Sequence, residues 1–177
     1  MKNIIGRSNY TLFLFTIGCF FTQLNAQNSN REISELIVYE TNLLRAEKDL
    51  PKLKLLDTLM NLAQYHSDNM VKYDFYSHID HQGLDPVERA ERQNIKAWSK
   101  RGNTFIGIAE NIANTPWFEN VIGCGDTRSP EKFSKCVVKS WKNSPPHYSN
   151  IMGDYTHIGV GVAFDKNGNG YSTQNFR

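Results

Sequence analysis

Residues 141–152 read WKNSPPHYSNIM, and residues 156–163 read THIGVGVA. The first stretch ends a helical pattern at two prolines and places His147 directly after them, because proline cannot continue a helix. The second stretch alternates apolar residues with Gly159, Gly161 and Ala163, which predicts a strand whose small-residue face admits a helix or backbone at close range. Together the two stretches predict a histidine-bearing turn that leads into a central strand.

Hydrophobic periodicity and turn chemistry place the remaining elements around this strand. Asp57 is expected to cap one helix, and Asp85 with Glu88 forms a capping box at the start of another. Asn167–Gly170 is expected to be a hairpin turn. Helices are predicted over residues 33–44, 57–72, 86–92 and 130–141, and strands over 102–111, 157–164 and 171–176.

Three side chains on separate segments are candidates for chemistry, namely His78, Glu110 and His147. Two imidazoles with water form an open site for Zn²⁺ or Cu²⁺, and the same pair can serve as acid and base. If residues 102–111 form a strand, Glu110 shares an apolar face with two isoleucines and needs a partner. From the residues alone, two alternatives stay open: unrelated surface histidines, and a structural salt bridge from Glu110 to an arginine. His66 lies on an apolar helical stripe and is predicted to be a core histidine.

These segments, in this order and closed by residues 173–176 (TQNF), resemble the CAP superfamily of cysteine-rich secretory, antigen 5 and pathogenesis-related-1 proteins, and in particular its bacterial secreted branch. The resemblance runs from about Ile33 to Phe176. It implies an α+β fold, a three-layer α-β-α sandwich, whose cleft holds His78 and His147 as metal ligands, with zinc as the metal. It implies that Glu110 is the first acid of the cleft and orients an imidazole, as carboxylates behind metal ligands do.

The chain departs from the better-known eukaryotic pattern of this superfamily at Ser144. That pattern has a second acid three residues after the tryptophan, where this chain has a serine. Ser144 can line the cleft and form hydrogen bonds, but it supplies neither charge nor a base. A mechanism that needs two carboxylates is therefore not expected.

The first 26 residues are predicted to be a secretory signal peptide, because Lys2 and Arg7 precede an apolar stretch and Ala26 offers a cleavage site. Residues 27–32 are expected to be a flexible arm, and residues 33–177 the CAP domain. No transmembrane segment is expected after cleavage. The protein is then secreted, periplasmic or extracellular, and a lipid anchor at Cys19 is the minor alternative.

Removal of that segment leaves Cys124 and Cys136. In an exported protein, two cysteines predict one disulfide, which would contribute about 3 kcal/mol to the stability of the fold. Two free thiols are the alternative. Two of the 20 Lys and Arg residues are removed as well, so 18 basic residues balance 18 acidic ones. We therefore expect no strong field for nucleic acid or for an anionic membrane.

Three functions follow as hypotheses. The first is a secreted CAP domain whose His/Glu cleft binds a metal or a ligand, with a small apolar molecule, a peptide or a cell-wall component as the partner. The second is a metal-dependent hydrolase directed at peptide or cell-wall material, in which the histidines hold a metal-bound water. The third is a structural surface module. The residues leave open whether the chain is an enzyme, and its oligomeric state is not encoded in any motif.

Overall fold

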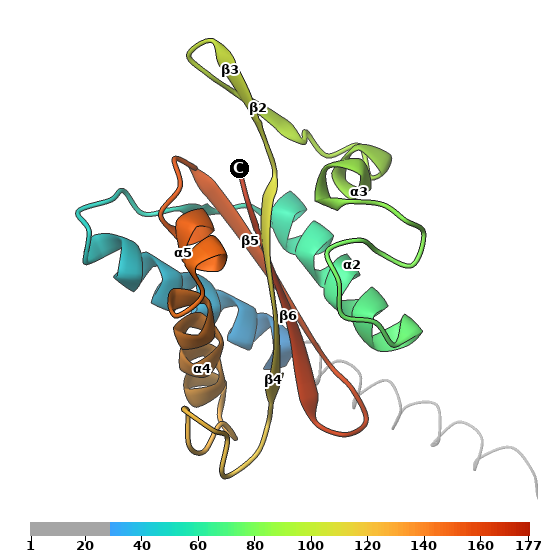
Figure 1. Cartoon of the computed structure of the whole chain (residues 1–177), viewed down its shortest axis with the longest axis vertical. Helices are drawn as coiled ribbons and strands as arrows, with labels where there is room; N and C mark the ends of the chain where they lie inside the picture. Colours follow the sequence, from blue (N-terminus) through green and yellow to red (C-terminus); the bar gives the residue numbers. More distant parts are fainter. Residues whose placement is uncertain (1–28) are drawn as a thin grey trace, which may run out of the picture.

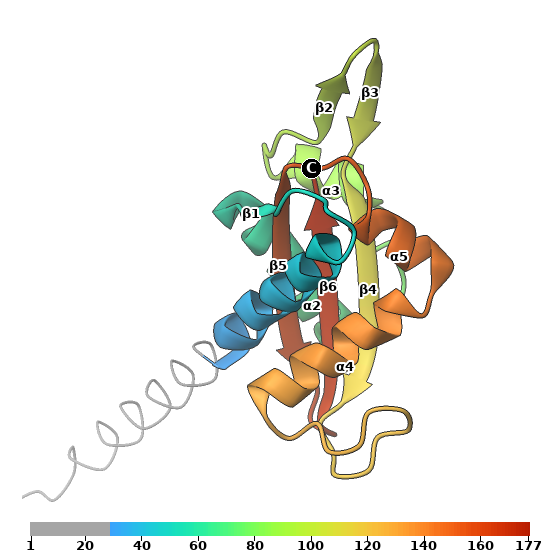
Figure 2. The same cartoon turned by 90° about the vertical axis from the view of Figure 1, so that its left-hand side faces the viewer.

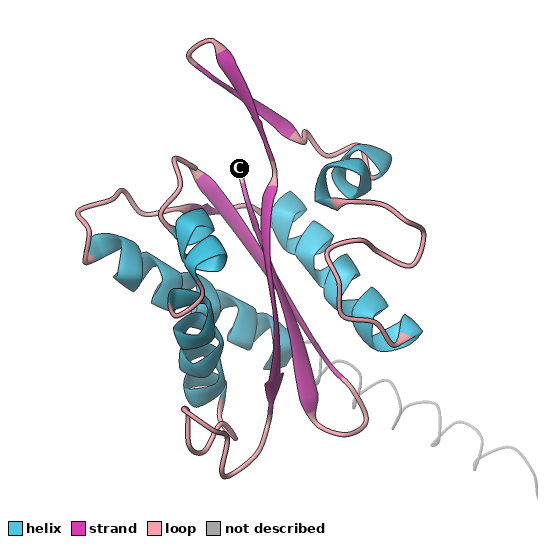
Figure 3. Cartoon of the chain, in the orientation of Figure 1, coloured by secondary structure: helices cyan, strands magenta, loops and turns pink. Residues whose placement is uncertain are grey.

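The computed structural model describes residues 29–177, so the predicted signal peptide and Cys19 lie outside the described residues. Its centre is a four-stranded sheet with the strand order β1–β5–β6–β4 (Figure 1, Figure 3). Strand β1 (Lys54–Leu55) runs parallel to β5 (His157–Phe164). Strand β6 (Asn169–Phe176) runs antiparallel to both β5 and β4 (Ala109–Pro116).

Helices cover both faces of this sheet (Figure 2). The N-terminal helix (residues 29–46), α4 (Pro130–Lys142) and α5 (Pro145–Ile151) lie on one face. Helix α2 (Asp57–Tyr73) lies on the other face across β5 and β6, and α3 (Pro86–Arg92) follows it. This arrangement confirms the expected α+β fold and its three α-β-α layers.

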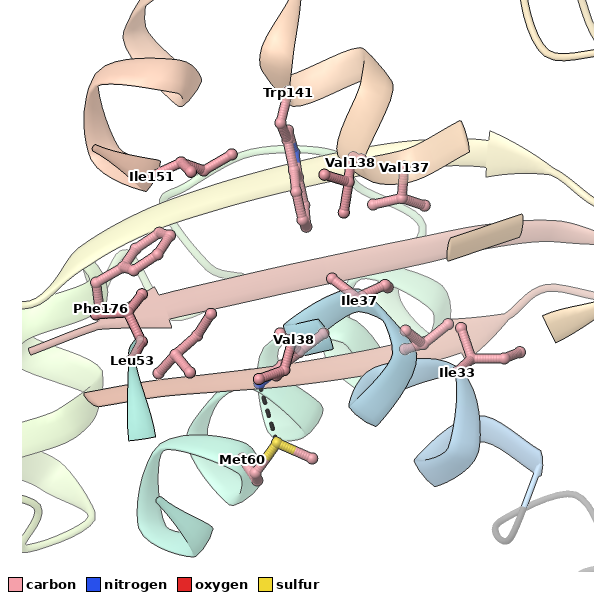
Figure 4. Close-up of a cluster of buried hydrophobic side chains, with 14 of the residues drawn as sticks. Ile33, Ile37, Val38, Leu53, Met60, Val137, Val138, Trp141, Ile151 and Phe176 are labelled. Carbon is pink, nitrogen blue, oxygen red and sulfur yellow. Dashed lines mark hydrogen bonds between the residues drawn. The ribbon is translucent and has the colours of Figure 1, made fainter. Parts of the chain in front are cut away.

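The larger apolar cluster fills the layer between the sheet and the N-terminal helix, α4 and α5 (Figure 4). Trp141 is its largest fully buried side chain, and its indole N–H donates to the carbonyl oxygen of Ile112 at 2.9 Å. A buried indole needs such a partner, so Trp141 ties α4 to the middle of β4. A smaller cluster on the α2 side consists of Leu59, Leu62, Ala90, Ala97 and Ile108.

The small-residue face of β5 lies directly against α2, as predicted from the sequence. A Cβ atom on Gly159 would lie 2.1 Å from the carbonyl carbon of Leu59, and one on Gly161 would lie 2.1 Å from the amide nitrogen of Gln64. Atoms cannot approach so closely, so a side chain at either position would push α2 away from the sheet. The glycines therefore fix how near α2 lies to the strands that carry the site.

The arm predicted over residues 27–32 is wrong in its described part, because residues 29–32 belong to the N-terminal helix. The Ser34 hydroxyl donates to the Asn30 carbonyl at 2.9 Å, and Arg31 pairs with Glu35 at 3.0 Å. Both contacts join residues four apart, as neighbours on a helix surface are. The apolar stripe begins only at Ile33, so periodicity alone does not mark the polar first turn as helical.

Two further boundaries differ from the prediction. Pro145 and Pro146 stop α4, as expected, but they also open α5, because proline is tolerated in the first turn, where its missing N–H is not needed. Helix α2 is preceded by Leu56 at its N-cap, without a side-chain hydrogen bond, so Asp57 is the first helical residue and not the cap. The capping box of Asp85 and Glu88 is confirmed.

The extended segment predicted over residues 102–111 is divided in the structure. Strands β2 (Trp98–Arg101) and β3 (Thr104–Gly107) form a separate antiparallel hairpin, and β4 begins only at Ala109. Gly102 has a φ of +57°, a left-handed conformation that suits glycine in the tight turn between β2 and β3.

The disulfide between Cys124 and Cys136 is present and joins the loop after β4 to the buried face of α4. Among residues 29–177, no helix combines the length and apolar character that a membrane-spanning helix needs. The described elements of the sandwich lie within residues 29–177, so a chain that begins at Gln27 contains the whole described fold.

Candidate functional site

The side chain of Glu110 is the centre of the site. It lies near the start of β4, is buried, and shares its strand register with Asn175 of β6. Its Oε2 accepts a hydrogen bond from the Asn175 side-chain amide at 3.1 Å and from the Arg89 guanidinium at 2.5 Å, and its Oε1 accepts one from His78 Nδ1 at 2.9 Å. Both carboxylate oxygens are therefore engaged.

Arg89 is the buried counter-ion of Glu110. It comes from α3, and besides the carboxylate it binds the carbonyl oxygens of His78 at 2.6 Å and Leu84 at 2.9 Å. A buried carboxylate is costly unless a charge and hydrogen bonds compensate it, and Arg89 supplies both. Because the same guanidinium holds the backbone of the loop that carries His78, it fixes that histidine relative to Glu110.

His78 lies on the loop after α2, and its side chain is 46% exposed. A carboxylate only accepts hydrogen bonds, so Nδ1 carries the proton that is shared with Glu110. In the neutral ring, Nε2 then has a free lone pair. Glu110 thus orients the ring and sets its tautomer, as carboxylates do behind metal-binding histidines.

His66 lies beneath this pair, in the third turn of α2, and is fully buried. Its Nε2 lies 3.0 Å from the carbonyl oxygen of Ser77, to which it donates, and 3.8 Å from Glu110 Oε1. Burial lowers the pKa of His66, so the ring is neutral at neutral pH. The predicted core histidine is confirmed as buried, and it also supports the loop that presents His78.

His147 lies in the first turn of α5, which is attached to β4 through Asn111. The Asn111 side-chain amide donates to the His147 carbonyl oxygen at 3.1 Å, and the Asn150 side-chain amide donates to Asn111 Oδ1 at 2.9 Å and to the Glu110 carbonyl at 3.2 Å. Asn111 and Glu110 are adjacent on β4 and project to opposite faces of the sheet, so one strand positions both halves of the site.

The ionisation of the site follows from these contacts. Burial by itself raises the pKa of Glu110, but the hydrogen bond from His78 and the positive charge of Arg89 outweigh it and hold that pKa below its ordinary value. Burial, and after it the positive charge of His78, lowers the pKa of His147. At neutral pH the site therefore contains an ionised Glu110 and a neutral His147.

The remaining predicted residues lie elsewhere or take other roles. Ser144 precedes α5 as its N-cap residue without a side-chain cap, and within residues 29–177 no hydrogen bond joins its hydroxyl to Glu110 or the two histidines. Cys124 lies on the loop after the Pro116 end of β4 and is bonded to Cys136 of α4, whereas Glu110 lies near the Ala109 end of β4. The disulfide therefore braces the fold away from the site.

The residues present can be compared with what zinc requires. Within residues 29–177, no group of three or more His, Cys, Asp or Glu side chains gathers as metal ligands, so a closed structural zinc site does not fit. The open kind of site agrees with His78, because its Nδ1 is tied to a carboxylate and its Nε2 is free, as in a metal-binding imidazole, and His147 on α5 is the second imidazole that such a site would use.

Sequence reasoning missed two essential members of the site, Arg89 and Asn175. Arg89 lies on a short helix whose pattern gives no sign that a charged residue faces inward, although a partner arginine for Glu110 was one of the open alternatives. Asn175 belongs to the closing TQNF segment, where residues 172–175 are all buried polar residues. A strand of consecutive buried polar side chains is unusual, and a run of polar residues in the closing strand could have indicated that Asn175 has a buried partner.

The chain is similar to known proteins over most of its length. The model of the cysteine-rich secretory protein family (CAP) matches residues 38–176. Over 149 residues the chain is 29% identical to the Bacillus subtilis (strain 168) uncharacterized membrane protein YlbC, in a match that covers 84% of this chain and 34% of that protein. This chain therefore spans about a third of the length of that relative.

Two solved structures share the fold. One is an extracellular protein containing an SCP domain from Bacillus anthracis str. Ames, with a TM-score of 0.62 and 22% identity over 83% of this chain and 40% of that one. The other is an outer surface protein from Borrelia burgdorferi, with a TM-score of 0.62 and 18% identity over 84% of this chain and 92% of that one. The family match over most of the chain, together with this fold, shows that the chain belongs to the cysteine-rich secretory protein (CAP) family.

Proposed function

We propose that this CAP domain acts outside the cytoplasm as a recognition module, and that His78 and His147 hold Zn²⁺ at the ligand-binding cleft. Zinc would be held by Nε2 of His78 and a ring nitrogen of His147, with its other positions left to water or to the ligand. Bound there, zinc supplies a Lewis acid that accepts an oxygen or nitrogen donor of the ligand. A peptide, a cell-wall component or a small apolar molecule with such a donor is the class of partner.

The observation that carries this proposal is that both oxygens of the buried Glu110 carboxylate accept hydrogen bonds from protein groups. Its two oxygens accept from Arg89, Asn175 and His78, and its pKa lies below the ordinary value. Such a carboxylate is a weak base, and its side chain is only 2% exposed, so its role is to hold the His78 ring. Positioning of a ligand-binding imidazole is the chemistry that this arrangement supports.

The same contacts weigh against a hydrolase that uses Glu110 as its general base. A general base must be within hydrogen-bond reach of the proton that it removes, and its pKa should lie near the working pH. Glu110 is buried behind His78, and its pKa is shifted in the opposite direction. Ser144 cannot replace it, because a serine hydroxyl supplies no base.

An extracellular location is part of the proposal. Among the structural relatives, one is described as extracellular and one as an outer surface protein. A disulfide between Cys124 and Cys136 suits an oxidising compartment. The predicted signal peptide would deliver the domain there, and a fractionation experiment that finds the protein in the cytoplasm would contradict this part.

The proposal is tested by calorimetric titration of Zn²⁺ into the chain from Gln27 onward, compared with His78→Ala/His147→Ala. We expect one site in the parent and none in the double variant. The matched control is His81→Ala/His157→Ala, which removes two histidines that lie outside the site and should bind zinc like the parent. His81 stacks on Tyr73, and His157 begins β5.

Equal zinc binding by the parent and by the His78/His147 variant would refute the metal site. If neither protein binds zinc, the metal is discarded, and with it the metal-dependent hydrolase. A cleft that recognises its ligand without metal, or a structural module, would then remain. Binding assays with peptide and cell-wall ligands distinguish these two possibilities. The His78/His147 double variant should lose binding only if the cleft recognises the ligand.

A further inference from the structure

The β2–β3 hairpin projects from the sandwich beyond the end of the sheet (Figure 1, Figure 2). It forms a two-stranded sheet of its own, with Trp98 opposite Gly107 and Lys100 opposite Phe105. Opposed residues of an antiparallel pair share a face, so Trp98, Lys100 and Phe105 lie on the same face of the hairpin. The hairpin adds no strand to the main sheet, so its presence needs an explanation other than the building of that sheet.

The aromatic side chains of this hairpin are directed outward. Phe105 is 64% exposed and Trp98 45% exposed, and neither belongs to an apolar cluster of residues 29–177. Trp98 is held at the hairpin base, where its indole N–H donates to Glu91 at 3.0 Å and its ring lies over Gly107. Exposed aromatic residues that lie together mark an interaction surface.

The charges around these aromatic residues are almost all positive. Between Glu91 and Glu110 the chain has four basic residues and no acidic one. They are Arg92, Lys96, Lys100 and Arg101. The balance of basic and acidic residues over the whole domain conceals this local excess, which is why composition predicts no field for an anionic membrane.

Further cations lie at the base of the hairpin. Arg177 donates to the Lys96 carbonyl oxygen at 2.9 Å, and Lys54 and Arg177 flank His157 across the strands. Burial lowers the pKa of His157, and the nearby charges of Arg177, Lys54 and Arg101 lower it further, which reflects the same positive potential. Acidic groups are also present at this end, since Glu91 accepts from Trp98 and Asp154, 85% exposed, lies 3.7 Å from Arg101.

We propose that the β2–β3 hairpin docks the domain on an anionic lipid surface. Trp98 and Phe105 enter the boundary between headgroups and acyl chains, where aromatic rings are favoured, and the neighbouring Lys and Arg side chains bind anionic headgroups. A polyanion such as nucleic acid or a charged polysaccharide would use the cations but would not require Phe105. The pairing of Phe105 with Lys100 on one face therefore favours a bilayer.

Docking through the hairpin would also place the site close to the membrane. Strand β3 ends at Gly107, and Glu110 follows three residues later on β4. The chain thus connects the projecting hairpin directly to the strand that holds the His78 loop. Ligands at a bilayer surface would be presented to the cleft from this end of the molecule.

The test is co-sedimentation of the chain from Gln27 onward with vesicles of phosphatidylcholine, and with vesicles of equal parts phosphatidylcholine and phosphatidylglycerol. We expect binding to the second kind only. Phe105→Ala/Lys100→Ala should weaken it by about tenfold or more, since one cation near an anionic surface and one inserted ring are both lost. Tryptophan emission should shift to the blue on binding, because Trp98 is the exposed one of the three tryptophans, whereas Trp117 packs against the core and Trp141 is buried.

The matched control is Ile122→Ala/Lys135→Ala, which removes one apolar side chain from the loop after β4 and one cation from α4, both outside the hairpin. Ile122 is 99% exposed, so the control should fold and bind vesicles like the parent. The proposal is overturned if no vesicle is bound, or if the control weakens binding as much as the hairpin variant. It is also overturned if the addition of vesicles leaves Trp98 emission unchanged and soluble heparin displaces the protein from them. The partner would then be a polyanion.

Discussion

The Nδ1 atom of His78 donates a 2.9 Å hydrogen bond to Glu110 Oε1, although 32 residues separate the two in the chain. The contact requires that a loop after α2 and the start of β4 be held together. Arg89 does this from α3, because it binds both the Glu110 carboxylate and the His78 carbonyl oxygen. One exposed imidazole is thereby fixed by a buried ion pair.

Replacement of Glu110 by glutamine should destabilise the fold. Glu110→Gln keeps the size of the side chain but leaves Arg89 buried without its counter-ion, which costs about 3 kcal/mol or more of unfolding free energy. Urea denaturation measures the loss. The control Asp154→Asn removes an acid whose side chain is 85% exposed and should change stability by less than about 0.5 kcal/mol. Similar values for both variants would contradict a buried ion pair.

Stability should fall as the pH is lowered, in two stages. The pKa of His66 lies below its ordinary 6.5, so the unfolded chain takes up a proton below about pH 6.5 that the folded protein refuses, and stability is lost there. The lowered pKas of His147 and His157 act in the same direction. Glu110, whose pKa lies below its ordinary 4.5, adds a second loss below that pH.

Urea midpoints of the parent and of His66→Gln, measured from pH 8 downward, check this. The variant should lose less stability than the parent in the first stage and as much as the parent in the second. A midpoint that rises between pH 7 and pH 5 would be incompatible with a buried neutral His66.

The contact between β5 and α2 should not tolerate a side chain. Gly161→Ala would place a methyl group 2.1 Å from the Gln64 amide nitrogen, and the resulting shift of α2 should cost about 2–4 kcal/mol. At Gly123 a methyl group would meet no atom within 4 Å, but φ is +78°, so Gly123→Ala should cost only about 1 kcal/mol through backbone strain. Thermal melts of both variants decide whether the close approach is real.

Loss of the disulfide should lower stability without affecting the site. Cys124→Ser/Cys136→Ser removes a cross-link between residues 12 apart in sequence and should cost about 3 kcal/mol. Because this bond holds the loop after the Pro116 end of β4, and Glu110 lies near the other end, zinc affinity measured at low temperature should not change. A large drop in affinity in a variant that is still folded would show that the disulfide loop shapes the cleft.

The sequence predicts the layers well because each layer depends on a local pattern. The alternation in β5, the stripe of α4 and the capping box at Asp85 are all confirmed, since periodicity reports directly which face is buried. The hairpin escapes prediction because its outward residues, Trp98 and Phe105, do not alternate as a half-buried strand does. The N-terminal turn escapes it because its polar residues carry no apolar stripe.

For the site, the sequence indicated His78, Glu110 and His147, and the structure places a hydrogen bond between the first two. Nothing local marked Arg89 as the counter-ion, because its role depends on how α3 lies against β4. The family resemblance indicated the acid and the histidines as candidates, whereas the long-range ion pair follows only from tertiary packing.

The most direct test of the cleft is ¹⁵N NMR of the imidazole rings during a Zn²⁺ titration of the chain from Gln27 onward. Before metal is added, His78 should be the Nδ1–H tautomer, because Glu110 accepts that proton. On addition of zinc, the ring nitrogens of His78 and His147 should shift together, while those of His81 and His157 stay in place. An Nε2–H tautomer at His78, or zinc shifts confined to the other histidines, would contradict the proposed cleft.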